Sequence, residues 1–170
     1  MTVPTSLTGG VLTVSDKGSR GMREDVSGRE VLHLLETMSV RVDAYEIIPD
    51  DKDMIKQKLI DYADHRKLDL IITTGGTGVN PRDVTPDATL EVVDKLIPGM
   101  AEMMRLESMS KTPYAMISRA VVGIRNKSLI INLPGSPKGA RENLSVLIPA
   151  LRHAIEKIKG DESDCAQPLQ

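Results

Sequence analysis

Apolar and polar positions follow two different periods along the chain, and the two periods alternate. Apolar runs of the length typical of buried strands lie at 11–14, 40–48, 68–74, 120–124 and 128–133. Apolar residues that recur every three or four positions, as on one face of a helix, lie at 26–38, 54–63, 86–97, 100–109 and 137–158. This order of strands and helices predicts an α/β fold with a mostly parallel sheet.

Capping residues mark the starts of several predicted helices. Asp25, Thr85 and Ser136 are suited to cap the helices that follow them, and proline takes the first helical position after the last two. The chain has 170 residues, which fits one domain. We therefore expect a single domain at 9–159, between flexible tails at 1–8 and 160–170.

The composition predicts an ordinary globular core that contains almost no aromatic residues. Hydrophobic residues make up 40% of the chain and charged residues 27%, with three Tyr and no Trp or Phe. The net charge of −2 argues against nucleic-acid binding, which favours a basic surface. No apolar run approaches the ~20 residues of a membrane span, so we expect no membrane association.

The cysteine content and the first residues of the chain favour a cytoplasmic location. The one cysteine, Cys165, cannot form an internal disulfide, and disulfides are typical of oxidising compartments. Residues 1–8 lack the basic region and apolar stretch of a secretory signal.

Polar segments follow four of the predicted strands, where an α/β sheet binds its ligands. Ser15 and Asp16 follow the first strand, and Asp50 follows the second. The segments 75–83 and 134–138 follow two more strands. We expect these segments to meet at one edge of the sheet.

A glycine-rich segment directly follows the most apolar strand. It comprises Thr74, Gly75, Gly76, Thr77 and Gly78. Glycines let a backbone approach a ligand closely, and their N–H groups form anion-binding nests, which favours phosphate binding. The same glycines also suit a sharp turn with positive φ. The segment matches neither the Walker loop nor the dinucleotide fingerprint, because no Gly-Lys-Ser/Thr follows and Pro81 stands where the third glycine would be.

Two aspartates in loops are candidates for a magnesium site. Asp50 and Asp83 each follow proline-containing turns, and Mg²⁺ binds one or two carboxylates together with substrate phosphates. Turn formation or helix capping would equally explain an aspartate at either position. Asp51 and Asp87 are competing candidates, although Asp87 better suits the first turn of a helix.

A second anion site is predicted where the last helix begins. Ser136, Pro137 and Lys138 offer free helix N–H groups, a hydroxyl and a positive charge, although a plain helix cap would look the same. Arg82, Arg119 and Lys138 are further candidates to neutralise phosphate oxygens.

Five segments of the chain together resemble the molybdopterin adenylyltransferase family, which includes MogA, MoaB and the gephyrin G domain. The matching segments span 70–78, 81–89, 98–100, 118–119 and 131–139, in order and with the family's spacing. The resemblance extends from about Gly10 to Ile158 and implies a single three-layer α/β domain with helices on both faces of the sheet.

The resemblance also implies an activity and a set of site residues. The reaction would transfer AMP from MgATP to molybdopterin and release pyrophosphate. Asp50 and Asp83 match the family's catalytic, metal-linked aspartates. The substrate-binding positions would be Ser15, Asp16, Thr74, Gly75, Gly76, Thr77, Gly78, Ser118, Gly135, Ser136, Pro137 and Lys138. The family implies a homotrimer or a hexamer, and product hand-over to a molybdate-insertion protein.

Two other functions stay open at this point. One is a MoaB-like molybdopterin-binding paralogue or scaffold with little turnover, which would release no pyrophosphate from MgATP. The other is a nucleotide- or phosphate-binding module of flavodoxin-like type, which would show no preference for a pterin.

Overall fold

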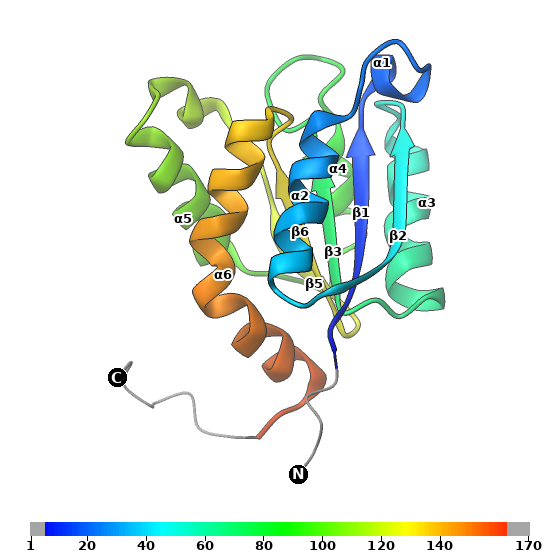
Figure 1. Ribbon diagram of the computed structural model, residues 1–170, viewed down its shortest axis with the longest axis vertical. Coiled ribbons are helices and arrows are strands. Elements are labelled where there is room, and N and C mark those ends of the chain that lie inside the picture. Colours follow the sequence, from blue (N-terminus) through cyan, green and yellow to red (C-terminus); the bar gives the residue numbers. More distant parts are fainter. Residues whose placement is uncertain (1–5, 163–170) are drawn as a thin grey trace.

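The computed structural model describes residues 6–162 and shows a six-stranded sheet between two layers of helices (Figure 1). The strands are β1 (Thr8–Val14), β2 (Arg41–Ile48), β3 (Leu70–Thr74), β4 (Lys95–Leu96), β5 (Val122–Arg125) and β6 (Ser128–Leu133). The helices are α1 (Asp16–Ser19), α2 (Val26–Thr37), α3 (Lys52–Ile60), η1 (Asp61–His65), α4 (Thr85–Leu90), α5 (Pro98–Met109), η2 (Pro113–Ile117) and α6 (Pro137–Lys159).

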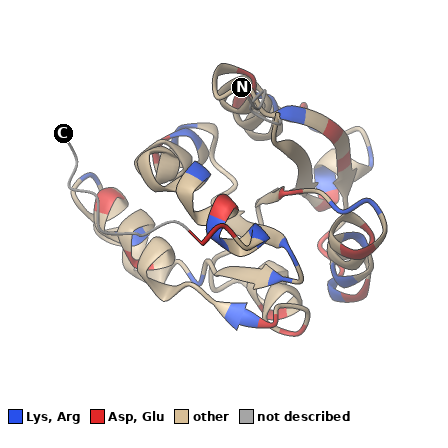
Figure 2. Ribbon diagram, turned by 90° about the horizontal axis from the view of Figure 1, so that it is seen from below, with Lys and Arg blue, Asp and Glu red and all other residues tan. Residues whose placement is uncertain are grey.

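The sheet is mostly parallel, as the alternation of strands and helices predicts. Its order is β2-β1-β3-β6-β5-β4, with β2, β1, β3 and β6 parallel to one another. The hairpin from β5 to β6 and the pairing of β4 with β5 are antiparallel. The central strands β1, β3 and β6 carry no charged residue, and the charged residues lie on the helices, loops and outer strands (Figure 2).

The apolar side chains of the central strands divide between two cores, one on each face of the sheet. Val11, Ile72 and Ile131 face one core, which α2, α5 and α6 cover. Leu12 and Ile71 face the other core, which α3 and α4 cover. Each fully buried side chain of this size contributes about 1.5–3 kcal/mol to folding. The three-layer architecture therefore follows from strands that are apolar on both faces.

The helix predicted at 86–97 is wrong in its second half. Helix α4 ends at Leu90, and the chain then forms the short edge strand β4 beside β5. The backbone carbonyl of Val92 accepts a hydrogen bond from Arg125 Nη1 at 2.7 Å, and Asp94 N donates to Ile124 O at 2.7 Å. The backbone groups of Val92 and Asp94 thus form hydrogen bonds with β5 instead of the hydrogen bonds of a longer helix. Thr85 is the first helical residue, whereas Val84 holds the cap position.

Two smaller differences concern the predicted loop and tails. The loop predicted at 17–24 contains the one-turn helix α1, which Ser15 caps through its hydroxyl. At the N-terminal end, Leu7 is already buried and β1 begins at Thr8. The remainder of the predicted tails, at 1–5 and 163–170, lies outside the described residues, and so does Cys165. Within 6–162, no helix is long and apolar enough to cross a membrane.

Candidate active site

The loops that follow β1, β2, β3 and β6 meet at one edge of the sheet. From β1 the chain goes to β2 on one side, whereas β3 and β6 extend the sheet on the other side (Figure 1). Such a reversal opens a crevice beyond the carboxyl ends of the strands. The predicted polar segments therefore lie together, as the sequence pattern indicates.

A hollow of about 480 Å³ occupies this crevice. Most of the predicted site residues line it, namely Ser15, Asp50, Thr74, Gly75, Gly76, Asp83, Gly135, Ser136 and Pro137. We call this space the switch-point hollow. Asp50 and Asp83 thus face one shared cavity, although 33 positions (83 − 50) separate them in the sequence.

The glycine-rich segment forms the floor of the switch-point hollow. Gly75 and Gly76 have φ values of +102° and +65°, so the turn that the sequence allows as an alternative is present. A Cβ on Gly75 would lie 2.3 Å from the carbonyl oxygen of Val14. The amides of Gly76 and Thr77 donate to no described residue. The turn therefore presents free N–H groups, and the two interpretations of the glycines are compatible.

Asp50 is held in place by reciprocal bonds with Asp16. The amide of Asp16 donates to Asp50 Oδ2 at 2.9 Å, and the amide of Asp50 donates to Asp16 Oδ1 at 3.1 Å. Arg82 adds a bidentate pair to the Asp16 carboxylate, with Nη2 2.9 Å from Oδ1 and Nε 3.1 Å from Oδ2. Asp16 lines neither hollow of the site. Its carboxylate therefore connects the loop carrying Asp50 to the loop carrying Asp83.

Asp83 both organises its own loop and faces the hollow. Its Oδ2 accepts a hydrogen bond from the amide of Asn80 at 3.0 Å, and its amide donates to the carbonyl of Asn80. A Cβ on Gly78 would lie 2.8 Å from the same Oδ2. Glycine at 78 therefore allows the carboxylate to lie against the backbone.

The electrostatics of the hollow suit a divalent cation that arrives with phosphate. Burial raises the pKa of Asp50 above its usual value, and the neighbouring carboxylates of Asp16 and Asp83 raise it further. A cation between these carboxylates would relieve the repulsion. Within the described residues, no group of three or more His, Cys, Asp or Glu side chains could hold a metal by itself. The carboxylates fit Mg²⁺ that also binds substrate phosphates.

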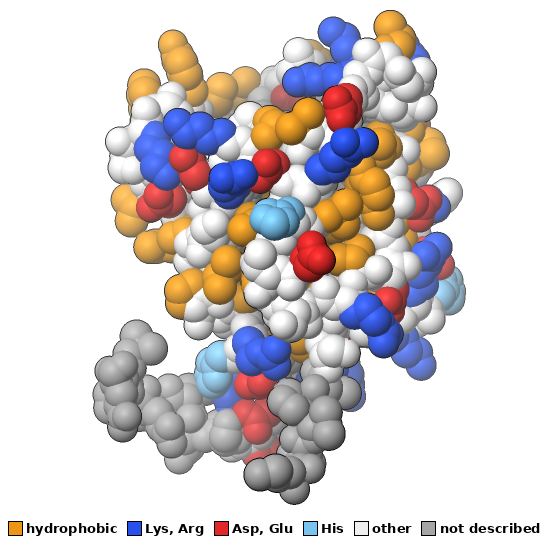
Figure 3. All heavy atoms as spheres, viewed as in Figure 1, with side chains coloured by type: hydrophobic (Ala, Val, Ile, Leu, Met, Phe, Trp, Pro, Cys, Tyr) orange, Lys and Arg blue, Asp and Glu red, His pale blue; other side chains and the backbone are white. Residues whose placement is uncertain are grey.

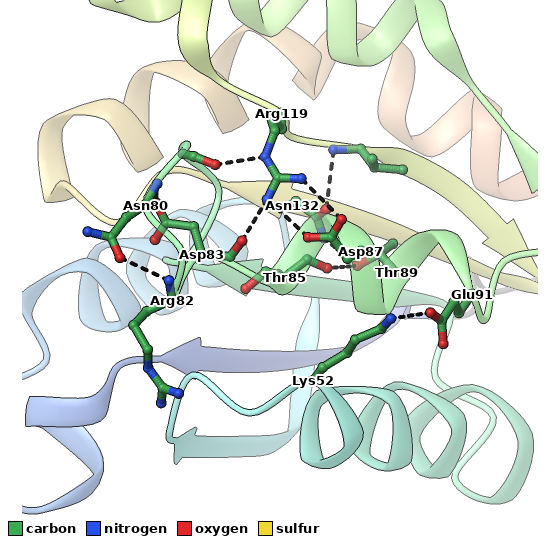
Figure 4. A network of polar contacts seen from close by, with 12 residues as sticks. Lys52, Asn80, Arg82, Asp83, Thr85, Asp87, Thr89, Glu91, Arg119 and Asn132 are labelled. Atoms are coloured by element: carbon green, nitrogen blue, oxygen red, sulfur yellow. Dashed lines mark hydrogen bonds and ion pairs between the residues drawn. The ribbon is translucent and has the colours of Figure 1, made fainter.

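Arg119 fastens the loop between the glycine turn and Asp83 (Figure 4). Its guanidinium donates to the carbonyl oxygens of Gly78 at 2.8 Å and Asp83 at 2.6 Å. It also pairs with Asp87, with nitrogen–oxygen distances of 3.0 and 3.1 Å. Both Arg119 and Arg82, which the sequence suggests as phosphate ligands, are thus bound to protein groups. Lys138 pairs with no described residue.

A second hollow of about 420 Å³ lies beside the first, between α5, η2 and the start of α6. We call it the helical hollow. Four of the five other predicted site residues line it, namely Thr77, Gly78, Ser118 and Lys138, whereas Asp16 does not. Tyr114, Ala115 and Ile117 supply an apolar wall. Ser136 lines both hollows, so the two cavities meet at the N-terminus of α6.

The sequence interpretation missed polar residues in both hollows. Asp25, predicted only as a helix cap, also lines the switch-point hollow and accepts hydrogen bonds at 2.6 Å from Thr13 and from Tyr45. Burial and the bond to Asp25 raise the pKa of Tyr45 to about 12. Arg105 and Asn143 line the helical hollow. No motif marks them, because they lie on helical faces where polar residues are common.

Comparison with known proteins places this chain and its fold in a defined family. The family model described as "Probable molybdopterin binding domain" matches residues 10–153, and the chain belongs to this family.

Molybdopterin adenylyltransferase of Helicobacter pylori strain J99 is 46% identical over 157 residues, which cover 89% of this chain and 88% of the relative. The corresponding protein of Escherichia coli K12 is 41% identical and covers 79% of this chain and 70% of its own length. The solved structure of the molybdopterin biosynthesis enzyme MoaB from Thermus thermophilus has a TM-score of 0.86 and 50% identity, covering 91% of this chain and 98% of its own.

Proposed function

We propose that this protein is a molybdopterin adenylyltransferase of molybdenum cofactor biosynthesis, which transfers AMP from MgATP to the phosphate of molybdopterin. The observation that carries the proposal is the position of Asp50 and Asp83 in one hollow with the glycine turn. A second hollow of suitable size opens beside it across Ser136. The names of the relatives agree with this chemistry.

The two hollows differ in chemistry, and we assign one substrate to each. The switch-point hollow offers carboxylates, the free amide of Gly76 and the start of α6, which suit MgATP and its phosphates. The helical hollow offers an apolar wall from Tyr114 and Ile117, which suits the flat ring of molybdopterin. The phosphate of molybdopterin then lies near Ser136, where the hollows join.

The proposed reaction needs positioning more than a strong base. A phosphate oxygen of molybdopterin attacks the α-phosphorus of ATP, the bond between the α-phosphorus and the bridging oxygen breaks, and pyrophosphate leaves. The attacking phosphate is already ionised at neutral pH, so the barrier comes from bringing two anions together. Phosphoryl transfer enzymes reduce such barriers by alignment and charge neutralisation.

Each proposed site residue has a place in this scheme. Asp50 and Asp83 would hold the magnesium ion that enters with ATP and supplies charge neutralisation at the phosphates. Lys138 would pair with the phosphate of molybdopterin. Ser118, which directly follows η2, would contact the same substrate. The other positions would bind phosphate oxygens through hydroxyl and amide groups, namely Ser15, Thr74, Gly75, Gly76, Thr77, Gly78, Gly135, Ser136 and Pro137.

Turnover by an Asp83→Ala variant tests the proposal. We expect the wild type to convert molybdopterin and MgATP into adenylylated molybdopterin and pyrophosphate. The variant should keep its fold, shown by an unchanged circular dichroism spectrum, and lose at least 100-fold in kcat. Asp53→Ala is the matched control, because Asp53 is an exposed aspartate in α3 outside both hollows. Wild-type rates in Asp83→Ala would contradict the role of Asp83.

The same assay addresses a second candidate function, that of a MoaB-like protein that binds molybdopterin with little turnover. The likeness to MoaB at 50% identity favours including it. Molybdopterin binding by the wild type without pyrophosphate release would support this alternative over the transferase.

We also propose that the protein works in the cytoplasm as a homotrimer, or as a hexamer, and hands its product to a molybdate-insertion protein. Exposed apolar side chains on α5 and η2 support contact between copies, among them Leu106, Tyr114 and Met116. Figure 3 shows hydrophobic side chains on the surface of the molecule in the view of Figure 1. Sedimentation equilibrium checks this assembly. A monomer at micromolar concentration would contradict it.

A further inference from the structure

Asn143 lies at the base of the helical hollow and is the most buried polar residue of α6. It is 5% exposed, and its Nδ2 donates to the hydroxyl of Ser108 on α5 at 2.6 Å. Both residues line the helical hollow. The bond joins the two helices beneath the space that we assign to molybdopterin.

The other polar atom of the Asn143 amide has no protein partner. Its Oδ1 accepts no hydrogen bond from any residue at 6–162. No fully enclosed side-chain nitrogen or oxygen in that part of the chain lacks a partner, so this atom is not fully enclosed, and Asn143 lines the hollow. Reversing the amide would exchange the two atoms and still leave one of them facing the hollow. An unused amide group at a buried position costs free energy unless something binds it.

Arg105 and Ser108 place further polar groups beside Asn143. Arg105 Nη1 donates to the carbonyl of Ala120 at 3.0 Å, and the remaining N–H groups of its guanidinium donate to no described residue. The Ser108 hydroxyl accepts from Asn143, and its own hydrogen binds no described acceptor. The bottom of the helical hollow thus offers one hydrogen-bond acceptor from Asn143 and several hydrogen-bond donors from Arg105 and Ser108.

We propose that Asn143 is a specificity-determining residue that reads the amino and oxo edge of the pterin ring, with Arg105 beside it. This inference rests on the proposed function, because it takes molybdopterin as the occupant of the helical hollow. The edge presents N–H donors at the ring amide and the amino group, next to a carbonyl acceptor. Asn143 Oδ1 accepts from the donors, and Arg105 donates to the carbonyl.

The same arrangement excludes adenine from the helical hollow. Adenine has ring-nitrogen acceptors but no carbonyl oxygen beside an N–H donor, so it cannot present the edge of donors and acceptor that Asn143 and Arg105 match in a pterin. Sites built to hydrogen-bond a substrate group reject analogues that lack it by factors of about 10⁴. Asn143 and Arg105 at the bottom of the helical hollow therefore favour binding of ATP in the switch-point hollow.

Equilibrium binding of molybdopterin, measured without ATP through its fluorescence, tests the inference. In Asn143→Leu the Kd for molybdopterin should rise at least tenfold, and the KM for molybdopterin should rise with it, because the amide is removed while the volume is nearly kept. The KM for ATP should stay within twofold of the wild type. Asn143→Asp should lose less affinity, since its carboxylate can accept from Ser108 and from the ring. Glu156→Gln, at an exposed position of the same helix outside both hollows, is the matched control and should bind as the wild type does.

Several outcomes would overturn the inference. One is an unchanged Kd in Asn143→Leu, and another is an equal loss for molybdopterin and ATP with a lowered Tm, which would indicate a structural role. If the leucine variant does not fold, Asn143→Ser removes the amide with less volume and answers the same question. A wild type that binds molybdopterin but releases no pyrophosphate would contradict the proposed function alone, and the binding comparison would still decide the role of Asn143. A wild type that binds no molybdopterin would overturn both.

Discussion

The two hollows of the site are built in different ways, although they share Ser136. The switch-point hollow is lined largely by the segments that follow β1, β2, β3 and β6, and several of its lining residues are glycines. The helical hollow is made mostly from residues of α5, η2 and α6, together with Thr77 and Gly78 of the glycine loop. Loops at strand ends are placed by the sheet, whereas helical side chains are placed by how the helices pack on each other. The first hollow is therefore defined by short motifs, and the second by tertiary packing.

The largest effect is expected from adding a side chain to the glycine turn of the switch-point hollow. In Gly75→Ala a Cβ must enter at φ +102° and lie 2.3 Å from the carbonyl oxygen of Val14. We expect the free energy of unfolding to fall by about 3 kcal/mol, which lowers Tm by roughly 10 °C. Thermal melting followed by circular dichroism checks this.

Gly99→Ala is the matched control for that experiment. A Cβ at Gly99 meets no atom within 4 Å, and the residue lies in the first turn of α5. Its Tm should stay the same or rise slightly, because alanine favours helix. Equal destabilisation by both substitutions would show that the glycine turn has no special requirement.

A smaller effect is expected at the opposite end of the sheet, far from both hollows. Buried Asp69 accepts hydrogen bonds from the amide of Thr8 at 2.8 Å and from Lys159 Nζ at 2.7 Å. Burial opposes ionisation of Asp69, but the bonds from Lys159 and Thr8 outweigh it and hold its pKa below the usual value. Asp69→Asn should lower the free energy of unfolding by about 2 kcal/mol at pH 7 without changing the KM of either substrate.

The pH dependence of this variant follows from the direction of the shift. Because the pKa of Asp69 is lower in the folded protein, its stabilisation is present above the pKa of the unfolded chain, near 4, and is lost as the pH falls through the folded value. The difference in unfolding free energy between wild type and Asp69→Asn should thus shrink below about pH 4. Urea titrations at several pH values measure it, and a constant difference would contradict the role of the ionised carboxylate.

The smallest expected effect concerns the bridge between the two aspartate loops. Removing the Arg82 guanidinium in Arg82→Ala frees the loop that carries Asp83 from Asp16, so kcat should fall about tenfold, or about 1.4 kcal/mol in the barrier. Arg82→Lys should recover only part of the rate, because lysine cannot form the bidentate pair. Lys127→Ala, in the exposed hairpin turn, serves as the control. Molybdopterin affinity should not change, since the helical hollow is untouched.

Most of the fold could be predicted from periodicity, and the errors have a local cause. The strands around Ile71 and Ile130 and the long helix after Ser136 appear where the pattern predicts them. The helix predicted through Leu96 ends at Leu90 instead, because backbone groups at 92–97 bond to β5. A six-residue apolar pattern suits a helix and an edge strand almost equally, so only the neighbouring strand decides between them.

The sequence by itself indicated that several polar and glycine residues of the switch-point hollow would lie together. Asp50, Asp83 and the glycines at 75–76 lie in short contiguous segments, and parallel strands bring the segments that follow them to one edge. Only the tertiary structure decided that Asn143 and Arg105 face a common cavity. They lie on separate helices, and the direction of a helical side chain is set by packing between helices that local sequence does not encode.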